Sequence, residues 1–361
     1  MFREQEDQII ADISNDGTRA KRQALRDPRY PGRRWHEGVK YFFDASASPQ
    51  VKSVFKKAAA QWMADTCIDF KEDKLGRWDL SKKERGCIGY RLVSAKDSIR
   101  VYMEDGCWSF VGRLGGIQNL SLGQGCESPD WLDQFALETI ATNDNYGLTY
   151  DYGSLMHYGA TSSSMNKKPT MVPKDIQYIE TLGSPFIGFY DLLMINKHYK
   201  CTDMCKGPSS CKNHGFPHPR DCKKCICPSG YGGPQCDRRP DGCGAELVAT
   251  DKWQTLKDDL GDRKAGGYPR EDFMKCNYWI KAPAGKKVQV KFVSFSQGVA
   301  TDGCPYAGVE IKTHADQRLT GYRLCSEDDK NTILTSTSNI VPVITYNRIY
   351  ATVATLEYRY I

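Results

Sequence analysis

The chain has 361 residues, a net charge of +6 and a hydrophobic content of 40%. This length is enough for two or three domains. The modest charge, and the lack of an aromatic stacking platform beside the basic run at residues 19–34, argue against a nucleic-acid-binding protein. No apolar run approaches the ~20 residues of a membrane-spanning helix, so no transmembrane segment is predicted.

Cysteines are the strongest compositional signal. There are fifteen, with seven in residues 201–236 and four in residues 243–325. This density is typical of disulfide-stabilised proteins made in an oxidising compartment, although Cys222-x-x-Cys225-x-Cys227 leaves a zinc site as a minor alternative. Residues 1–8 are polar and lack the apolar core of a signal peptide. We expect a secreted protein whose signal peptide is missing from the sequence given.

The N-terminal residues 1–22 are charged and end in Arg19-Ala20-Lys21-Arg22. A dibasic sequence just before a change in composition indicates a proprotein-processing site, with a chance basic cluster as the alternative. We therefore interpret residues 1–22 as the remnant of a propeptide.

Residues 29–201 have the pattern of a mixed α/β domain. Alternating apolar residues predict strands at 35–43, 98–103 and 117–122. Ser48-Pro49 opens a helix, because proline is favoured in a first helical turn. Residues 71–85 are predicted to be a charged loop, and residues 191–201 a terminal helix. The apolar face of the first helix is predicted to contain Val51, Val54, Phe55, Ala58, Trp62 and Met63.

The remainder of the chain changes character twice. Residues 201–236 are loop-rich and contain five glycines, and residues 238–242 read as a linker. From Cys243 onward the pattern is all-β, with clear alternation at residues 287–292. A small disulfide-rich module followed by a β-sandwich is therefore expected.

The hexapeptide Ser154-Leu155-Met156-His157-Tyr158-Gly159 resembles the Met-turn of the astacin family of zinc metalloproteases. Further matching segments extend the resemblance over residues 23–201, and they are Tyr30-Pro31, Gln61-Trp62, Cys67-Ile68-Asp69-Phe70, Gly106-Cys107-Trp108-Ser109, Gly112-Arg113-Leu114-Gly115-Gly116, Leu120-Ser121-Leu122 and Ile195-Asn196-Lys197. Residues 202–237 resemble an EGF-like module and residues 243–361 a CUB domain. The resemblance thus implies an α+β metzincin-like domain, then an EGF-like module and an all-β CUB sandwich, as in nematode-type astacins.

The catalytic motif of that family is missing from this chain. Astacins hold zinc with a His-Glu-x-x-His-x-x-Gly-x-x-His helix, and no His-Glu-x-x-His occurs here. The only His-Glu pair, His36-Glu37, is followed by Lys40 at the second ligand position. The expected helix is absent after Cys126, where the sequence runs abruptly into Pro129. The domain is therefore expected to be incomplete, with non-native packing around Met156.

The resemblance assigns roles to several residues that remain. Tyr158 corresponds to the family's additional zinc ligand and oxyanion-stabilising tyrosine, and Met156 to the apolar floor beneath the zinc. The substrate-pairing edge strand is expected to consist of Gly116, Ile117, Gln118, Asn119 and Leu120. Asn119-Leu120-Ser121 is also a glycosylation sequon, which we expect to be unused on a substrate-facing strand.

The resemblance also pairs the cysteines. The expected pairs are Cys67–Cys201, Cys107–Cys126, Cys205–Cys222, Cys211–Cys225, Cys227–Cys236, Cys243–Cys276 and Cys304–Cys325. Cys87 is left over, either as a free thiol or as an intermolecular partner.

Two functions follow from these features. By resemblance the protein is a secreted zinc endopeptidase acting on extracellular proteins, and this chain is an inactive form because its zinc ligands and general base are missing. The alternative is an extracellular pseudoprotease that binds other proteins through its EGF-like and CUB modules. Family-like sequence on both sides of the abrupt junction favours the first, because gradual decay replaces ligands one at a time.

Overall fold

The computed structural model describes residues 24–25, 32–73, 97–104, 106–110, 112–123, 143–162, 164, 166 and 168–361. The chain divides into two compact units, Met1–Thr149 with Asn196–Cys201, and Tyr150–Ile195 with Thr202–Ile361. The expected propeptide remnant, its processing residues Arg19, Lys21 and Arg22, and Cys87 lie outside the described residues. Within the described part of the chain, no helix is both long and apolar enough to cross a bilayer.

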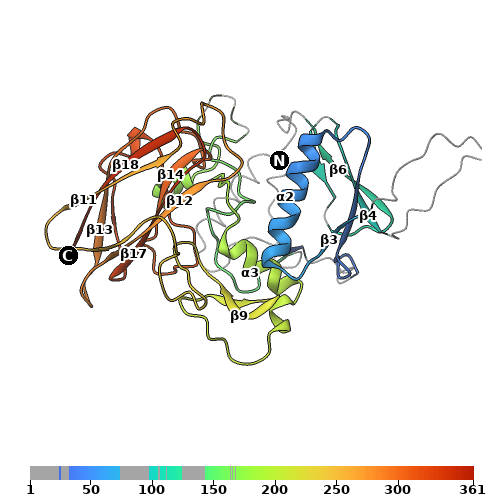
Figure 1. Ribbon diagram of the computed structural model, residues 1–361, viewed down its shortest axis with the longest axis horizontal. Helices are drawn as coiled ribbons and strands as arrows, with labels where there is room; N and C mark the ends of the chain where they lie inside the picture. Colours follow the sequence, from blue (N-terminus) through green and yellow to red (C-terminus); the bar gives the residue numbers. More distant parts are fainter. Residues whose placement is uncertain are drawn as a thin grey trace, which may run out of the picture. The chain divides into compact units, whose positions relative to one another are not determined.

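The first unit contains a five-stranded sheet in the order β3-β2-β4-β6-β5 (Figure 1). Its strands are β2 (Val39–Phe43), β3 (Phe70–Glu72), β4 (Ser98–Tyr102), β5 (Cys107–Ser109) and β6 (Ile117–Leu122). All neighbours are parallel except β5, which runs antiparallel to β6. A separate pair joins β1 (Ala24–Leu25) to β7 (Asn143–Asp144). The predicted strands at 35–43, 98–103 and 117–122 all lie in the five-stranded sheet.

Strand β5 covers β6 only from Leu120 to Leu122, so the expectation of an open edge is wrong for Leu120, and for Gly116, Ile117, Gln118 and Asn119 it stays a prediction. The reason is that Cys107–Ser109 folds back along the C-terminal half of β6, where Cys107 pairs with Leu122 and Ser109 with Leu120. On its other side, β6 pairs with β4 from Ile117 to Ser121. Beside Leu120–Leu122 the edge position therefore belongs to β5.

Helix α2 (Pro49–Asp65) packs beside this sheet (Figure 1). Ser48 caps its first turn, because its hydroxyl accepts a hydrogen bond of 3.2 Å from the Val51 amide. The Phe55 ring packs against the Tyr41 ring of β2, with 4.7 Å between centroids. Of the predicted apolar face, Val54 (52% exposed) and Ala58 are exposed, so the prediction is wrong for these two residues.

The first unit also contains the end of helix α3 (Phe189–His198). A disulfide joins Cys67, just after α2, to Cys201, and the Asn196 side chain donates a 2.8 Å hydrogen bond to the Asp65 carbonyl. These bonds fix the residues that follow α3 to the end of α2. The expected bond between Cys107 and Cys126 involves a residue outside the described ranges.

The second unit includes a disulfide-rich module with little regular structure. The short helix η3 (Cys201–Met204) precedes the hairpin of β8 (Phe216–His218) and β9 (Asp221–Ile226). Three disulfides close it, and they join Cys205 to Cys222, Cys211 to Cys225 and Cys227 to Cys236. Such bonds stabilise a module whose core is too small to do so alone.

The C-terminal part of the second unit is a β-sandwich of two sheets, ordered β10-β12-β17-β14-β15 and β11-β18-β13-β16. Side chains along β13 and β18 alternate between buried and partly exposed, as expected for strands with one face on a core. Disulfides join Cys243 to Cys276 and Cys304 to Cys325. The elements are β10 (Glu246–Val248), β11 (Gln254–Gly261), β12 (Met274–Lys281), β13 (Val288–Phe295), β14 (Ala307–Ile311), β15 (Tyr322–Leu324), η4 (Glu327–Asp329), β16 (Ile333–Thr335), β17 (Ile340–Asn347) and β18 (Ala351–Tyr360).

A cluster of buried charges lies at one face of the β14–β17 sheet. Glu310 and Arg323 form an ion pair of 3.2 Å, and their side chains are only 5% and 2% exposed. Lys312 is also buried, and its ammonium donates to the Ser229 hydroxyl and the Leu319 carbonyl, each at 2.9 Å. Burial by itself would raise the pKa of Glu310, but Arg323, Lys312 and hydrogen bonds from Gly321 and Ser229 outweigh burial and lower this pKa.

Replacing Glu310 by glutamine should lower the free energy of unfolding by about 3–5 kcal/mol, because it leaves two buried cations without their counter-charge. The matched control is Glu357→Gln in the same sandwich, where the 3.1 Å pair with Lys291 is partly exposed. It should cost less than about 1 kcal/mol. Urea unfolding followed by tryptophan fluorescence measures both changes. Equal losses in the two variants would show that burial adds nothing to the Glu310 pair.

Candidate functional site

The Met-turn lies in the second unit and is held by one carboxylate. Ser154 is fully buried, and its hydroxyl donates a 2.5 Å hydrogen bond to Asp191 in the first turn of α3. The other Asp191 oxygen accepts hydrogen bonds from the Leu155 amide at 3.1 Å and the Gly188 amide at 2.8 Å. Sequence reasoning missed Asp191, whose signal is an acidic residue in the first turn of a helix.

The side chains that the family directs at zinc are open to solvent here. Met156 is 78% exposed and Tyr158 is 43% exposed. The ring of His157 turns back on its own segment, with its Nδ1 atom 2.7 Å from the Tyr158 carbonyl oxygen. The backbone of the Met-turn is therefore held in place by Asp191, while the side chains of Met156 and Tyr158 are exposed to solvent.

The histidines of the expected peptidase domain lie on separate elements. His36 precedes β2 and lines a first-unit cavity of about 300 Å³ together with Glu37 and Lys40. His198 ends α3, where its Nδ1 atom lies 2.8 Å from the Tyr146 hydroxyl. Burial, reinforced by nearby Arg34, lowers the pKa of His198 to about 4, so this imidazole is neutral at pH 7.

The residues that are present do not fit a catalytic zinc. Such a site needs three protein ligands and an open position for water. Among the described residues, the one group of three close potential ligands is Glu180, Cys304 and Cys325. The two cysteines are bonded to each other, so neither sulfur is available as a thiolate.

Glu180 lies instead in an acidic environment beside that disulfide. Its carboxylate is 3.9 Å from the Cys325 sulfur. Burial, with the negative charges of Asp329, Asp302 and Asp328, raises the pKa of Glu180 to about 7. The group is thus partly protonated near neutral pH and stabilises the fold best when it carries its proton.

The segment that carries the Met-turn, residues 150–195, is anchored to the β-sandwich by buried polar contacts. Asp151 is fully buried and accepts hydrogen bonds from the amide and the hydroxyl of Thr320, both at 3.1 Å. Gly153 packs against the same threonine, and a Cβ atom at this glycine would lie 2.3–2.6 Å from the Thr320 side chain. Only glycine fits this close approach.

Further contacts extend this anchor along the segment. The Tyr322 hydroxyl donates to Asp175 at 2.7 Å, and the Tyr190 hydroxyl to Asp316 at 2.6 Å. The guanidinium of Arg323 donates to the Ser184 hydroxyl at 2.6 Å. Each bond joins the segment to the sandwich, which explains why both belong to one compact unit.

Comparison with known proteins identifies the family. Residues 28–132 and 128–200 match the model of the astacin peptidase family, in two pieces, and residues 252–351 match the CUB domain model. Zinc metalloproteinase nas-25 of Caenorhabditis elegans is 33% identical over 96% of this chain and 92% of its own length. The chain belongs to the astacin family. Its architecture is an astacin domain, a disulfide-rich region and a CUB β-sandwich.

Other relatives of this astacin are longer than the chain. Zinc metalloproteinase nas-31 of Caenorhabditis elegans is 44% identical over 95% of the chain, which spans only 58% of that relative. The alignment is 381 positions long, more than the 361 residues of the whole chain. Within the aligned region, nas-31 therefore has residues that have no counterpart in this chain. Among solved structures, the hatching enzyme HCE-1 of medaka fish is 19% identical, with a TM-score of 0.36, over 49% of this chain and 99% of that one.

Thr320→Val should loosen the Met-turn segment of this astacin, because it removes one hydrogen bond from the buried Asp151 carboxylate while keeping the side-chain volume. The expected cost is about 1–3 kcal/mol. Hydrogen exchange of the amides in residues 150–162 should accelerate, whereas the exposed-threonine control Thr255→Val in β11 should leave it unchanged. Unchanged exchange in Thr320→Val would contradict the anchoring role.

Glu180→Gln should stabilise the protein above neutral pH. Because the folded pKa is raised, Glu180 favours folding fully below its unfolded pKa, and this contribution is lost as the pH rises towards about 7. The glutamine variant keeps the neutral shape and should gain about 1–2 kcal/mol at pH 8 after allowance for solvent screening, and nothing at pH 4. Thermal unfolding across this range measures the difference, and an equal gain at both pH values would refute the assignment.

Proposed function

We propose that this chain is a form of a secreted zinc metalloendopeptidase from which the zinc-binding helix is missing, and that this form does not hydrolyse peptide bonds. The observation that carries the proposal is the split match to the astacin model. Its two pieces end and begin within residues 128–132, where family-like sequence stops and resumes. The alignment to nas-31, longer than the chain itself, supports a missing internal segment.

The ligand chemistry agrees with loss of activity. Zinc-dependent hydrolysis requires a metal-bound water and a general base to activate it. The chain contains neither the three histidines nor the glutamate of the family motif. Tyr158 and Met156 are interpreted as remnants of the site, and the exposure of both side chains supports this, because the zinc-binding helix that would cover them is missing from the sequence.

The setting proposed for the protein is extracellular. Dense disulfides in residues 201–325 support synthesis in an oxidising compartment, and we infer cleavage of a propeptide after Arg22. Substrates of the complete enzyme would be extracellular proteins or peptides.

A second function is favoured by the intact C-terminal half. Residues 202–237, as an EGF-like module, keep three disulfides, and residues 243–361, as the CUB domain, keep two disulfides and a continuous core. A protein without catalysis could act there as an extracellular binding protein. A transcript with an in-frame His-Glu-x-x-His segment at the junction would favour the peptidase origin, and a contiguous junction in every transcript would favour this second function.

The purified chain should contain less than about 0.1 zinc per molecule and show no cleavage of a fluorogenic peptide, because it lacks three ligands. Metal analysis by mass spectrometry and a peptidase assay test this. Inserting, at residues 128–132, a helix with the family motif His-Glu-x-x-His-x-x-Gly-x-x-His should restore one zinc per chain. The matched control is the same insertion with its histidines changed to alanine. One zinc per unmodified chain, lost in Tyr158→Phe or His157→Ala, would overturn the proposal.

A further inference from the structure

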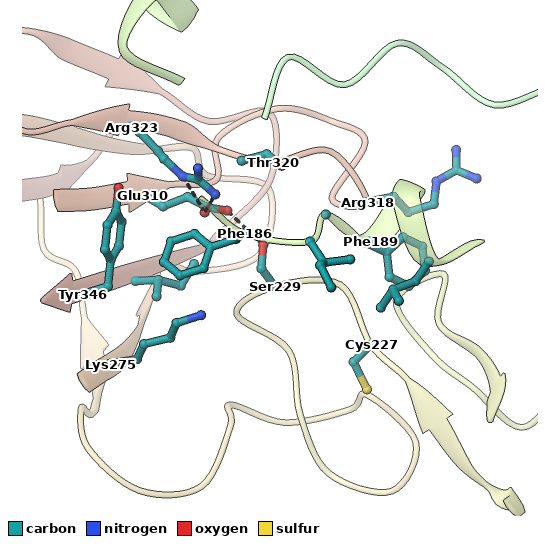
Figure 2. Close-up of a pocket in the computed structure, with 14 residues that line it drawn as sticks. Phe186, Phe189, Cys227, Ser229, Lys275, Glu310, Arg318, Thr320, Arg323 and Tyr346 are labelled. Carbon is teal, nitrogen blue, oxygen red and sulfur yellow. Dashed lines mark hydrogen bonds and ion pairs between the residues drawn. The ribbon is translucent and has the colours of Figure 1, made fainter. Parts of the chain in front are cut away.

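A cavity of about 160 Å³ lies within the second unit, and no Met-turn residue lines it (Figure 2). Three parts of the chain line it, namely residues 186–192, the disulfide-rich module at Cys227 and Ser229, and the strands of the CUB sandwich. An apolar protein cavity of comparable size can hold a benzene molecule. The cavity is therefore large enough for a small ligand rather than for a single water molecule.

Most of the charges around this cavity are neutralised by neighbours. Glu310 is paired with Arg323 and accepts a 2.8 Å hydrogen bond from Ser229. Arg318 is paired with Asp316 at 2.8 Å, and Figure 2 shows its guanidinium directed away from the centre of the cavity. Glu310, Arg323 and Arg318 thus each have an oppositely charged partner.

Lys275 is the exception. The residue as a whole is exposed, and its ammonium points towards the cavity, 3.9 Å from the centroid of the Phe186 ring (Figure 2). A cation over an aromatic face is attracted to it, but the ring satisfies few of the three N–H donors. Within the residues that the structure describes, this ammonium has no hydrogen-bond acceptor or ion-pair partner. The cavity thus presents one uncompensated positive charge.

The remaining walls are apolar. Phe186 and Tyr346 pack edge to face at 4.9 Å, and Phe189, Leu192 and Ile344 complete the lining. Ligand sites typically combine such walls with a few polar groups that fix orientation. An occupant that satisfies both features has an apolar body and one negative charge.

We propose that this cavity binds a carboxylate attached to a benzene-sized apolar group. The carboxylate accepts hydrogen bonds from the Lys275 ammonium, and the apolar group lies among Phe186, Phe189 and Ile344. Either a free small acid or the C-terminal residue of a peptide has this chemistry. This site is independent of the proposed peptidase ancestry, since neither Tyr158 nor Met156 contributes to it.

The titration of Lys275 gives the proposal a pH signature. Burial lowers the pKa of Lys275 to about 8, while Glu310 of β14 raises it and Arg323 of β15 lowers it. The ammonium is mostly charged at pH 7 and mostly neutral at pH 9.5. Binding of a carboxylate should therefore weaken as the pH rises through about 8, and bound carboxylate should shift that midpoint upward.

Calorimetric titration of the full chain with benzoate, benzamide, phenylalanylphenylalanine and its C-terminal amide tests the site. Benzoate should bind at pH 7 at least about tenfold more tightly than neutral benzamide. The dipeptide should bind more tightly than its amide if the source is a peptide terminus, and benzoate alone should bind if the source is a free acid. Absence of carboxylate binding up to 20 mM (roughly the limit for millimolar affinities) overturns the proposal.

Lys275→Met keeps the length of the side chain and removes its charge, and it should reduce benzoate affinity at least about tenfold. Lys257→Met, at an exposed position of β11, is the matched control and should leave the affinity unchanged. Unchanged affinity in Lys275→Met, or a wild-type affinity that is the same at pH 7 and pH 9.5, contradicts the proposal. The pH comparison uses the wild-type chain alone and remains decisive if the variant does not fold.

Discussion

The buried charges of Glu310, Arg323 and Lys312 set the main constraint on the second unit. Charges removed from water need partners, and the sandwich supplies only some of them. Arg323 reaches Ser184 in the peptidase-derived segment, and Glu310 and Lys312 both reach Ser229 in the disulfide-rich module. Three parts of the chain that are distant in sequence must therefore meet for the cluster to be satisfied.

This constraint explains how the Met-turn can be held without contacts from a metal centre. Residues 150–195 are held by the CUB sandwich through Asp151 and Thr320, and the turn itself is held by Asp191. None of these bonds depends on the missing helix. The side of the turn that the zinc-binding helix would cover is exposed to solvent. Met156 on that side is therefore largely exposed, while Ser154, two residues earlier, is buried.

Local patterns in the sequence predicted local structure well. The cap at Ser48 and the alternation at residues 287–292 both specify elements through contacts with near neighbours, and these are the elements observed. The identity of the edge strand could not be predicted, because it depends on how Cys107–Ser109 folds back on β6. The contact of Asp151 with Thr320, 169 residues away, could not be predicted from the sequence either, because a single buried carboxylate produces no periodic pattern.

The bond between Cys67 and Cys201 bears on how forms of different length can coexist. It closes a loop of 134 residues that contains the junction at residues 128–132. The entropy lost on closing a flexible loop depends only on the logarithm of its length, and even a doubling costs only about 0.6 kcal/mol. Insertion or excision of a helix at the junction therefore hardly changes the tendency of these two cysteines to meet. The same disulfide can therefore form during oxidative folding whether or not the zinc-binding helix is present.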